Sequence, residues 1–364
     1  MAAAVQEGLY LRSLLNEMDM TCDGPTVINE DNQSCIKICK NPVMQKCTKH
    51  IDVKYHFVRE RVEDGTFALE FALARFQTFL GSKQPKRDPK QLWIAKSVES
   101  AKSFLDFDQK SPFLTLFNWT SGMSRKSTFY DPYVYIEKQI NKLEMREINQ
   151  TYQKLQKDKA FCWMVSQCHV YNARFETMSS IINNLHEPIH LWGSAAQKCM
   201  PEANKSKIID HGQTKKFEET TIENIKKCKF YFAFENANCS DYVTEKFSNA
   251  LISYAIPIVN GWRDSYENML PRSFIHVSDF QNSSHLVSYL TYLLGNETAY
   301  LEYFEWRQNF RVFGVFDDMT HKYNTRCKVC QRVFDWKKAK SEKLRESETI
   351  KNLADEFYQS QTCV

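Results

Sequence analysis

The feature that most constrains the fold is an alternation of short apolar segments with amphipathic ones, from about Ala68 onward. The apolar segments have the length and composition of buried strands. They are FCWMVS (161–166), PIHLWG (188–193), KFYFAFE (229–235), IPIVNG (256–261) and SFIHV (273–277). Strands that alternate with helices form right-handed βαβ units and a parallel sheet. The pattern therefore predicts an α/β protein with a Rossmann-like domain.

The intervening segments have helical spacing. Segment 172–185 places Phe175, Met178, Ile182 and Leu185 on one face of a predicted helix. Further helices are predicted at 221–228 and 283–296.

The stretch FYFAFENANCSDYVTEKFSNAL (230–251) joins a predicted strand to a predicted helix through a polar turn that contains Glu235, Asn236 and Asp241. Asp241 or Thr244 is a suitable N-cap for this helix. Its predicted apolar face consists of Phe247, Ala250, Leu251 and Tyr254. Open α/β sheets bind ligands where a strand ends and a helix begins, and the free N–H groups of the helix favour an anion.

Length and composition limit the possible functions. The 364 residues suffice for about two domains, and a net charge of +4 is too small to indicate a nucleic-acid-binding protein. The chain has neither a GxGxxG fingerprint nor a Walker A glycine run, which argues against the usual dinucleotide and P-loop sites. No window approaches the roughly 20 apolar residues of a membrane span, and the first residues lack the basic and apolar regions of a signal peptide.

Cysteines and glycosylation sequons leave the cellular compartment open. The chain has 12 cysteines and a single CxxC, at Cys327 and Cys330. Chance in an Asn-rich chain and passage through the secretory lumen explain the sequons equally well. They begin at Asn32, Asn118, Asn149, Asn204, Asn238, Asn282 and Asn296.

Two cations are predicted at the carboxyl end of the sheet. Arg174 and Lys246 each lie in the first turn of a predicted helix that follows an apolar strand. The leaving group of a nucleotide-sugar diphosphate gains negative charge in the transition state, so two such cations can hold one diphosphate. Glu245 offers carboxylate oxygens for ribose hydroxyls, and Tyr242 offers a phenol. From this cluster alone, a solvated Glu–Lys pair at a helix start is the alternative.

Several segments resemble the α1,3-fucosyltransferases of glycosyltransferase family 10, over about residues 68–364. The hallmark segments are KFYFAFENANCSDYVTEKFSNAL (229–251), IPIVNGWRDSYENMLPRSFIHVSDF (256–280), YLEYFEWR (300–307) and CKVC (327–330). Those that resemble the family's acceptor side are QLWIAKSVES (91–100), LFNWTSG (116–122) and DPYVYI (131–136).

The resemblance implies an α/β protein of GT-B architecture, with two Rossmann-like domains facing a cleft. It implies inverting transfer of fucose from GDP-fucose to a GlcNAc hydroxyl of a glycan. The N-terminal domain is expected to be truncated, because the family's opening strands are replaced here. Residues 68–150 are expected to form a partial acceptor-side domain, and residues 151–330 a domain that binds GDP-fucose. Residues 331–364 are expected to form a helical tail. The family is membrane-anchored in the Golgi lumen, although this chain lacks the signal anchor.

The resemblance also assigns the catalytic base. Direct displacement needs a group that takes the proton of the attacking hydroxyl, and a carboxylate in a partly dry cleft suits this role. The family's Glu-Ser-Pro element falls on Glu99, Ser100 and Ala101, so Glu99 is the expected base, with Ser100 and Ala101 beside it at the acceptor. Ala101 replaces the usual proline, which changes the expected shape of the loop.

Donor contacts carry over from the family residue by residue. Gln167 departs from the family's asparagine, and His190 and Trp192 depart from its pattern on the next strand, which predicts a different pocket floor. The expected donor-binding residues are Tyr133, Ser166, Gln167, Arg174, Tyr231, Asn236, Tyr242, Glu245 and Lys246.

Arg174 and Lys246 supply the positive charge that the diphosphate needs, so no metal ion is expected at the donor site. The triplet DFD at Asp106–Asp108 resembles a manganese-nucleotide motif of another glycosyltransferase fold but lies far along the chain from the donor strand.

If the strands near Cys162 and Cys228 are neighbours, the two cysteines are at disulfide distance, and the family has a similar bridge. Cys327 and Cys330 are expected to bond back to the first domain.

Residues 1 to about 67 resemble the C-terminal part of a Copia-type retrotransposon ribonuclease H domain. The matching segments include PTVINEDNQSCIKICKNP (25–42) and CTKHIDVKYHFVRERVEDGTF (47–67). Asp31 and Asp52 match two of the carboxylates that hold a metal pair in that family. Two carboxylates are an incomplete set, so we interpret the segment as an inactive remnant.

Three functions compete on sequence grounds. In the first, the chain is an active fucosyltransferase. In the second, it is a pseudoenzyme from a chimeric gene that binds a nucleotide sugar. In the third, it acts on nucleic acid through its first segment. The small net charge and the incomplete carboxylate set argue against the third. The first two share a donor site, and turnover separates them.

Overall fold

The computed structural model describes residues 26–30, 67–71, 94–104, 117–168, 170–193, 196–212, 219–314, 328, 332 and 361–364. The chain divides into two units, Met1–Lys86 and Arg87–Val364. In the first unit, β1 (Thr26–Glu30) pairs in parallel with β2 (Phe67–Phe71). Strand β2 therefore contains the expected boundary between the segments 1–67 and 68–150. Asp31 and Asp52 lie outside the described residues, as do the DFD triplet, Cys327 and Cys330.

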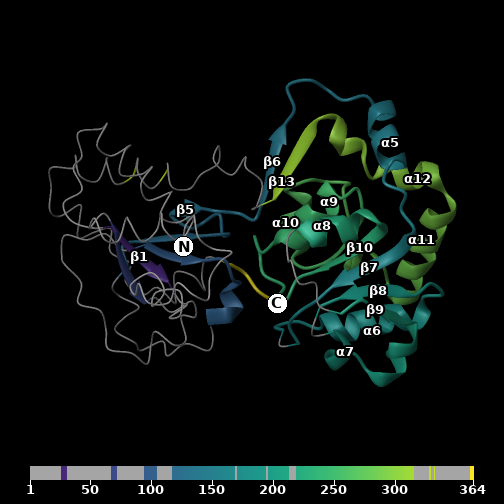
Figure 1. Ribbon diagram of the computed structural model, residues 1–364, viewed down its shortest axis with the longest axis horizontal. Coiled ribbons are helices and arrows are strands. Elements are labelled where there is room, and N and C mark those ends of the chain that lie inside the picture. Colours follow the sequence, from purple (N-terminus) through teal and green to yellow (C-terminus); the bar gives the residue numbers. More distant parts are fainter. Residues whose placement is uncertain are drawn as a thin grey trace, which may run out of the picture. The chain divides into compact units, whose positions relative to one another are not determined.

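A parallel six-stranded sheet forms the centre of the second unit, in the order β12-β11-β10-β7-β8-β9 (Figure 1). The strands are β7 (Lys159–Met164), β8 (Ile189–Trp192), β9 (Ile208–Asp210), β10 (Cys228–Phe234), β11 (Ile256–Asn260) and β12 (Ile275–His276). The strands predicted from the five apolar segments are all present. They read as continuous apolar runs because both faces of a parallel sheet are covered.

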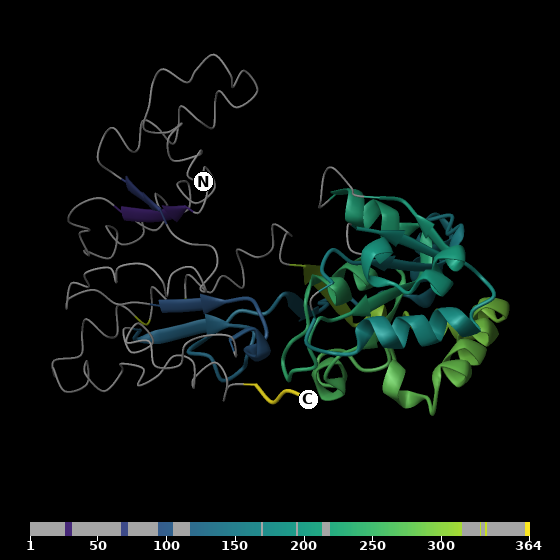
Figure 2. The ribbon, with the colours of Figure 1, turned by 90° about the horizontal axis from the view of Figure 1, so that it is seen from below.

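Helices cover both faces of this sheet. The first face packs against α6 (Arg174–Asn184) and α11 (Ser283–Gly295), which contact each other (Figure 2). The second face packs against α8 (Glu219–Lys226), α9 (Glu245–Ile252) and α10 (Arg263–Glu267). The predicted helices at 172–185, 221–228 and 283–296 are thereby confirmed.

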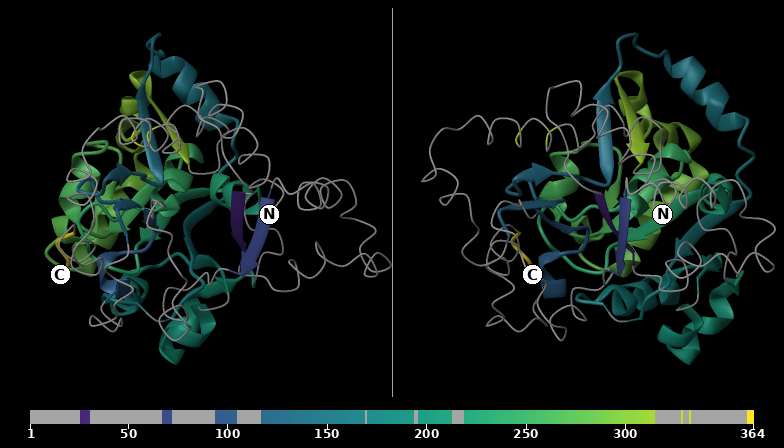
Figure 3. Two further views of the ribbon diagram at one scale, coloured as in Figure 1. Left: turned by 90° about the vertical axis from the view of Figure 1, so that its left-hand side faces the viewer. Right: turned by 60° about the vertical axis from the view of Figure 1, so that its left-hand side comes forward.

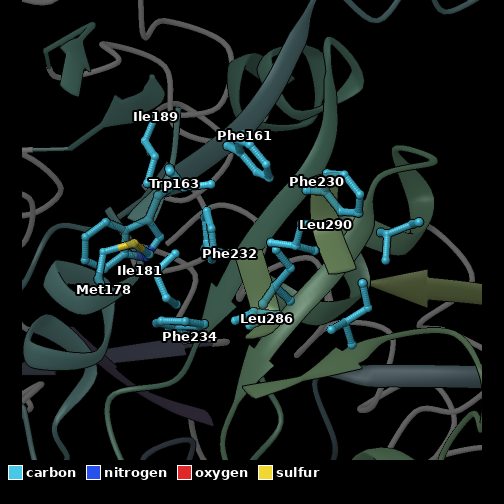
Figure 4. Close-up of a cluster of buried hydrophobic side chains, with 14 of the residues drawn as sticks. Phe161, Trp163, Met178, Ile181, Ile189, Phe230, Phe232, Phe234, Leu286 and Leu290 are labelled. Atoms are coloured by element: carbon cyan, nitrogen blue, oxygen red, sulfur yellow. The ribbon is translucent and has the colours of Figure 1, made fainter. Parts of the chain in front are cut away.

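The core follows the two-residue period of β10. Phe230, Phe232 and Phe234 point to the α6 and α11 side, while Tyr231 and Ala233 point to the α9 side. Figure 4 shows the phenylalanines packed with Phe161, Trp163, Met178 and leucines of α11. Fully burying one such side chain contributes about 1.5–3 kcal/mol. This core fixes the carboxyl ends of β7 and β10, from which the candidate site is built.

Helix α9 begins as predicted but ends earlier. Thr244 is its N-cap position, and Phe247, Ala250 and Leu251 are buried. The prediction that Tyr254 continues this face is wrong. Tyr254 lies after the helix with a positive φ of 54°, and the guanidinium of Arg307 lies 3.5 Å from its ring centre.

Smaller sheets and helices complete the second unit. β6 (Val134–Lys138) pairs antiparallel with β13 (Phe310–Gly314), and both strands stand side by side in Figure 3. β3 (Ile94–Ser97), β4 (Trp119–Gly122) and β5 (Phe129–Tyr130) form a parallel sheet, and η2 (Ala101–Phe104) follows β3. The remaining helical segments are α5 (Met145–Gln153), α7 (Ala196–Cys199), η4 (Glu202–Lys207), η5 (Val277–Asp279), α12 (Glu297–Glu302) and η6 (Glu305–Gln308).

Disulfides connect distant parts of the second unit. The predicted Cys162–Cys228 bridge is present, with Cys162 inside β7 and Cys228 at the first position of β10. Two bridges were not predicted, Cys168–Cys199 and Cys239–Cys363. Each such cross-link typically stabilises a fold by about 2–4 kcal/mol.

Within the described ranges, no helix has both the length and the apolarity required to span a bilayer.

Candidate active site

A cavity of about 790 Å³ lies at the carboxyl ends of β7 and β10. Ten of the residues singled out from the sequence line it: Glu99, Tyr133, Ser166, Gln167, Arg174, Tyr231, Asn236, Tyr242, Glu245 and Lys246. Ser100 and Ala101, which follow Glu99 in the chain, are buried and do not line the cavity. One cavity therefore collects the side chains from segments that lie up to about 150 residues apart in the chain.

The convergence follows from the topology. Ser166 and Gln167 follow β7, Asn236 follows β10, and Arg174 and Glu245 begin the helices that come next. Because β7 and β10 are parallel neighbours, their carboxyl ends lie at one edge of the sheet. Backbone hydrogen bonding fixes this edge, since the N–H of Tyr171 donates to the carbonyl oxygen of Asn236 at 2.7 Å.

Lys246 is held by a buried acidic group rather than by solvent. Its Nζ lies 3.2 Å from Oε2 of Glu235 and 3.2 Å from Oε1 of Glu245, and it donates to Oγ1 of Thr244 at 2.7 Å. Burial lowers the pKa of Lys246, but the two carboxylates outweigh it and raise the pKa overall. The Glu245–Lys246 pair of the alternative is present, with side chains 33% and 21% exposed, but Lys246 is also paired with Glu235, whose side chain is fully buried.

Glu235 organises the start of α9. Its Oε1 accepts the backbone N–H of Thr244 at 2.7 Å, and its carboxylate also accepts the Thr244 hydroxyl. Burial raises the pKa of Glu235, which Lys246 and the Thr244 hydrogen bonds oppose. At Glu245, burial also raises the pKa, but the Lys246 ammonium and its hydrogen bond outweigh burial and lower it. The Lys246 ammonium thus stands between two acidic partners.

Arg174 has the opposite environment. Its side chain is 3% exposed, and Nη2 donates to the Gln167 carbonyl oxygen at 2.6 Å. Within the described residues its Nε is buried without a hydrogen-bond partner, although the Glu235 carboxylate is close enough to raise the pKa of Arg174 against the effect of burial. Burial lowers the pKa of Arg174, but a guanidinium remains charged at neutral pH.

A second polar atom in the cavity wall lacks a partner. The Oδ1 of Asn236 is buried and accepts no hydrogen bond from any described residue. A buried polar atom without a partner costs about 1–3 kcal/mol, so two of them in one wall call for an explanation. A ligand that presents an anionic oxygen to Arg174 and a hydroxyl or amino group to Asn236 would satisfy both.

Glu99 reaches the cavity from the loop after β3. The loop is held locally, since the N–H of Glu99 donates to Oγ of Ser97 at 3.2 Å. The hydroxyl of Tyr242 donates to Oε2 of Glu99 at 3.3 Å. Burial, followed by the charges of nearby carboxylates, raises the pKa of Tyr242 and that of Tyr133. Both phenols therefore stay protonated and act as donors at neutral pH.

The sequence did not identify every wall of the cavity. Thr221, Ile222 and Glu223 of α8 and Gly314 of β13 line the cavity outside any recognised motif, and Asn249 of α9 lies in a hallmark segment without having been assigned a role. They reach the cavity only because tertiary packing sets their helices and strands there. Glu235 carried a signal, a carboxylate at the end of an apolar strand, but no role was assigned to it.

His190 and Trp192 do not line the cavity. Trp192 stacks on His211 with ring centres 4.4 Å apart, and Nδ1 of His190 lies 2.9 Å from Nε2 of His211. Burial lowers the pKa of both histidines, and Lys159 adds to the effect. The predicted change in the pocket floor is therefore wrong for this cavity.

Within the part of the chain that the structure describes, no group of three or more His, Cys, Asp or Glu side chains could hold a metal ion.

Comparison with known proteins identifies relatives of the second unit. Residues 154–354 match the family model described as "Glycosyltransferase family 10 (fucosyltransferase) C-term". The 4-galactosyl-N-acetylglucosaminide 3-alpha-L-fucosyltransferase 9 of Bos taurus and that of Homo sapiens are each 33% identical over 231 residues, 63% of this chain. The Glycoprotein 3-alpha-L-fucosyltransferase A of Drosophila melanogaster is 33% identical over 193 residues, 52% of this chain and 35% of its own length.

The matched region is a part of these relatives. The chain spans about half the length of the two fucosyltransferases 9, 56% of each. Among solved structures, one described as "Crystal Structure of alpha1,3-Fucosyltransferase with GDP-fucose" aligns with a TM-score of 0.42 and 16% identity, over 78% of this chain and 82% of that chain.

Proposed function

The chain belongs to glycosyltransferase family 10, the fucosyltransferases, and from this membership we propose that it transfers fucose from GDP-fucose to a GlcNAc hydroxyl of a glycan. The proposed linkage is α1,3, with inversion at the fucose C1. The observation that carries the proposal is the single cavity in which the ten residues converge. The names of the similar proteins, 3-alpha-L-fucosyltransferases that act on N-acetylglucosaminides or glycoproteins, support the donor and the acceptor class.

Arg174 is the first diphosphate ligand in this proposal. Among the described residues its Nε–H has no hydrogen-bond acceptor, so a phosphate oxygen would gain a charge-assisted hydrogen bond there. Asn236 would accept a hydrogen bond from a hydroxyl or amino group of the same nucleotide sugar through its free Oδ1. The leaving diphosphate gains charge as the bond to fucose breaks, so Arg174 would stabilise the transition state more than the ground state.

Lys246 is the second ligand, but its ammonium already donates to Glu245 and Thr244 and forms an ion pair with Glu235. A phosphate would compete with these partners, so we propose that one of them is released when it binds. Glu245 is the candidate, because its side chain is 33% exposed whereas that of Glu235 is fully buried. Once released, the Glu245 carboxylate would accept hydrogen bonds from the ribose hydroxyls, with Tyr242 nearby.

Glu99 is the proposed base. Its Oε1 takes the proton of the acceptor hydroxyl as that oxygen attacks C1 of fucose from the face opposite to the diphosphate. The bond between C1 and the phosphate oxygen breaks, GDP leaves, and the configuration at C1 inverts. Oε2 keeps the hydrogen bond from Tyr242, which fixes the orientation of the carboxylate.

The finer parts of the assignment rest on the family resemblance. We propose the GT-B arrangement, with 68–150 as a truncated acceptor-side domain, 151–330 as the GDP-fucose domain and 331–364 as a tail. Divalent metal and nucleic acid are not required by this mechanism. The proposed location is the Golgi lumen, and three disulfides among the described residues support an oxidising compartment.

Residues 1–67 keep their interpretation as a retroelement ribonuclease H remnant. Asp31 and Asp52 would be the remaining carboxylates of its metal site. The resemblance in sequence is the support for this proposal, which assigns the segment no part in fucose transfer.

Fucose transfer by the full chain tests the function. We expect labelled fucose to move from GDP-fucose to a GlcNAc-containing acceptor, and Glu99→Gln to lower kcat by about 10²–10⁴-fold with unchanged GDP affinity. GDP binding without transfer in the parent would contradict catalysis and favour the pseudoenzyme. Neither binding nor transfer would contradict the donor site as well.

A further inference from the structure

We propose that residues 361–364, which the Cys239–Cys363 disulfide fixes in place, form a clamp on the loop that carries Glu99. Gln361 positions this loop, and its role rests on the proposed function. Gln361 is a positioning residue in this account, because it acts on the base through the loop and does not line the cavity. The clamp connects two regions more than 250 residues apart in the chain.

The first half of the clamp is a short antiparallel ladder. The N–H of Ser240 donates to the Thr362 carbonyl oxygen at 2.7 Å, and the N–H of Val364 donates to that of Asn238 at 2.9 Å. The Cys239–Cys363 disulfide closes this ladder covalently. Segment 361–364 is thereby fixed to the turn between β10 and α9, which supplies Tyr242 to the cavity.

The second half holds the loop after β3. Oε1 of Gln361 accepts the N–H of Ala101 at 2.8 Å, and both residues are buried, with 8% and 2% exposure. The ammonium of Lys102 donates to the main-chain oxygen of Val364 at 2.9 Å. Glu99 lies two residues before Ala101, so these contacts fix the backbone on which the base stands.

The same turn reaches Glu99 from the other side. Tyr242, three residues after Cys239, donates its hydroxyl to the Glu99 carboxylate. Cys239 and Tyr242 pack in one apolar cluster, against which Cys363 also lies. The Glu99 loop is thus tied to one turn twice, directly through Tyr242 and indirectly through Gln361.

The hydrogen bond between the clamp and the Glu99 loop depends on the residue at position 101, which is Ala101. A proline there has no N–H and cannot donate to Gln361. Alanine supplies the donor, so the departure from the Glu-Ser-Pro element gives the chain a hydrogen bond that the proline form lacks. Gln361 supplies the matching acceptor from the other end of the unit.

The experiment compares the full-length parent with Gln361→Ala, which loses the acceptor, and Gln361→Glu, which keeps an Oε acceptor on a side chain of the same length. Gln153→Ala is the matched control, because Gln153 also makes a hydrogen bond to a residue distant in the sequence, donating its Nε2 to Glu297, and it has no contact with the clamp in the described hydrogen bonds. Two readouts are taken for each protein. They are amide hydrogen exchange over 98–104, which needs no activity, and the kinetics of fucose transfer with GDP affinity.

For Gln361→Ala we expect faster exchange over 98–104, unchanged exchange over 228–234, and a kcat about tenfold to a hundredfold lower with unchanged GDP affinity. Gln361→Glu and Gln153→Ala should match the parent. In a Glu99→Gln background, Gln361→Ala should cause no further loss of kcat, because there is no base left to position. A purely structural role would add its loss in both backgrounds.

Unchanged exchange over 98–104 in Gln361→Ala overturns the clamp, whatever the activity. Faster exchange with unchanged kcat, or an equal loss in the Glu99→Gln background, overturns the positioning role. A parent that transfers no fucose overturns the proposed function together with the positioning role, while hydrogen exchange still decides whether the clamp exists.

Discussion

The two walls of the cavity are held in different ways. The donor wall consists of the carboxyl ends of buried strands, where Arg174 is 3% exposed and Lys246 is held by Glu235, which is fully buried. The opposite wall carries Glu99 on a loop after a four-residue strand, and side-chain hydrogen bonds hold it. The difference indicates that recognition of the nucleotide is built on a rigid scaffold, while the catalytic group stands on a loop whose position depends on a few contacts.

Removing an aromatic ring from the core under the donor wall should have the largest effect on stability. Phe232 is fully buried between Phe161 and Phe234, so Phe232→Ala should lower the free energy of unfolding by about 3–5 kcal/mol. Val98→Ala, on the exposed loop beside Glu99, is the matched change in the other wall and should cost less than about 0.5 kcal/mol. Chemical denaturation measures both. Equal losses would contradict the contrast between scaffold and loop.

The scaffold should also respond to pH through His276, which is 4% exposed at β12. Its Nδ1 accepts the N–H of Ser278 at 3.1 Å and its Nε2 lies 3.0 Å from the Gly261 carbonyl oxygen, which suits the neutral ring. Burial lowers the pKa of His276 below the ordinary 6.5, although Gly261 and Asp279 oppose this. The unfolded chain therefore binds the proton first as the pH falls.

The stability that His276 contributes is consequently present above pH 6.5 and is lost as the pH falls from there toward the folded-state pKa. We expect the free energy of unfolding to decrease over that window with a slope of at most about 1.4 kcal/mol per pH unit from this group. His276→Gln should remove that part of the slope, and denaturation curves at several pH values measure it. An unchanged slope would show that His276 is not the responsible group.

The direct link between the two walls should have the smallest effect. Tyr242→Phe removes the hydroxyl that donates to Glu99, a net contribution of about 1 kcal/mol, so kcat should fall about threefold to tenfold. GDP affinity should change little if the ring keeps its packing. A loss of GDP affinity without a loss of kcat would assign Tyr242 to the donor rather than to the base.

Much of the sheet was predictable because strands buried on both faces are apolar throughout. The positions of Arg174 and Lys246 followed from that, since each begins a helix after such a strand. The pairing of β6 with β13 and the Cys239–Cys363 bridge were not predictable, because they depend on contacts between distant segments. The link from Ala101 to Gln361 spans 260 residues, and Gln361 lies in no motif.

The electrostatics of Lys246 also required the structure. The sequence places Glu245 beside it, which reads as a surface pair. The second partner, Glu235, lies eleven positions earlier, and the turn between β10 and α9 brings it to the same ammonium. Only the folded turn shows that the Lys246 charge is already balanced, while the Arg174 Nε has no hydrogen-bond partner in the described part of the chain.

The central claim is that Arg174 faces the diphosphate of the donor, and calorimetric titration of the full chain with GDP tests it most directly. Arg174→Ala should weaken GDP binding at least about tenfold, the loss of one charge-assisted hydrogen bond of about 1.5–3 kcal/mol. Arg263→Ala, which removes an exposed arginine paired with Asp279, should leave the affinity unchanged. Equal GDP affinity in the parent and in Arg174→Ala would contradict the account.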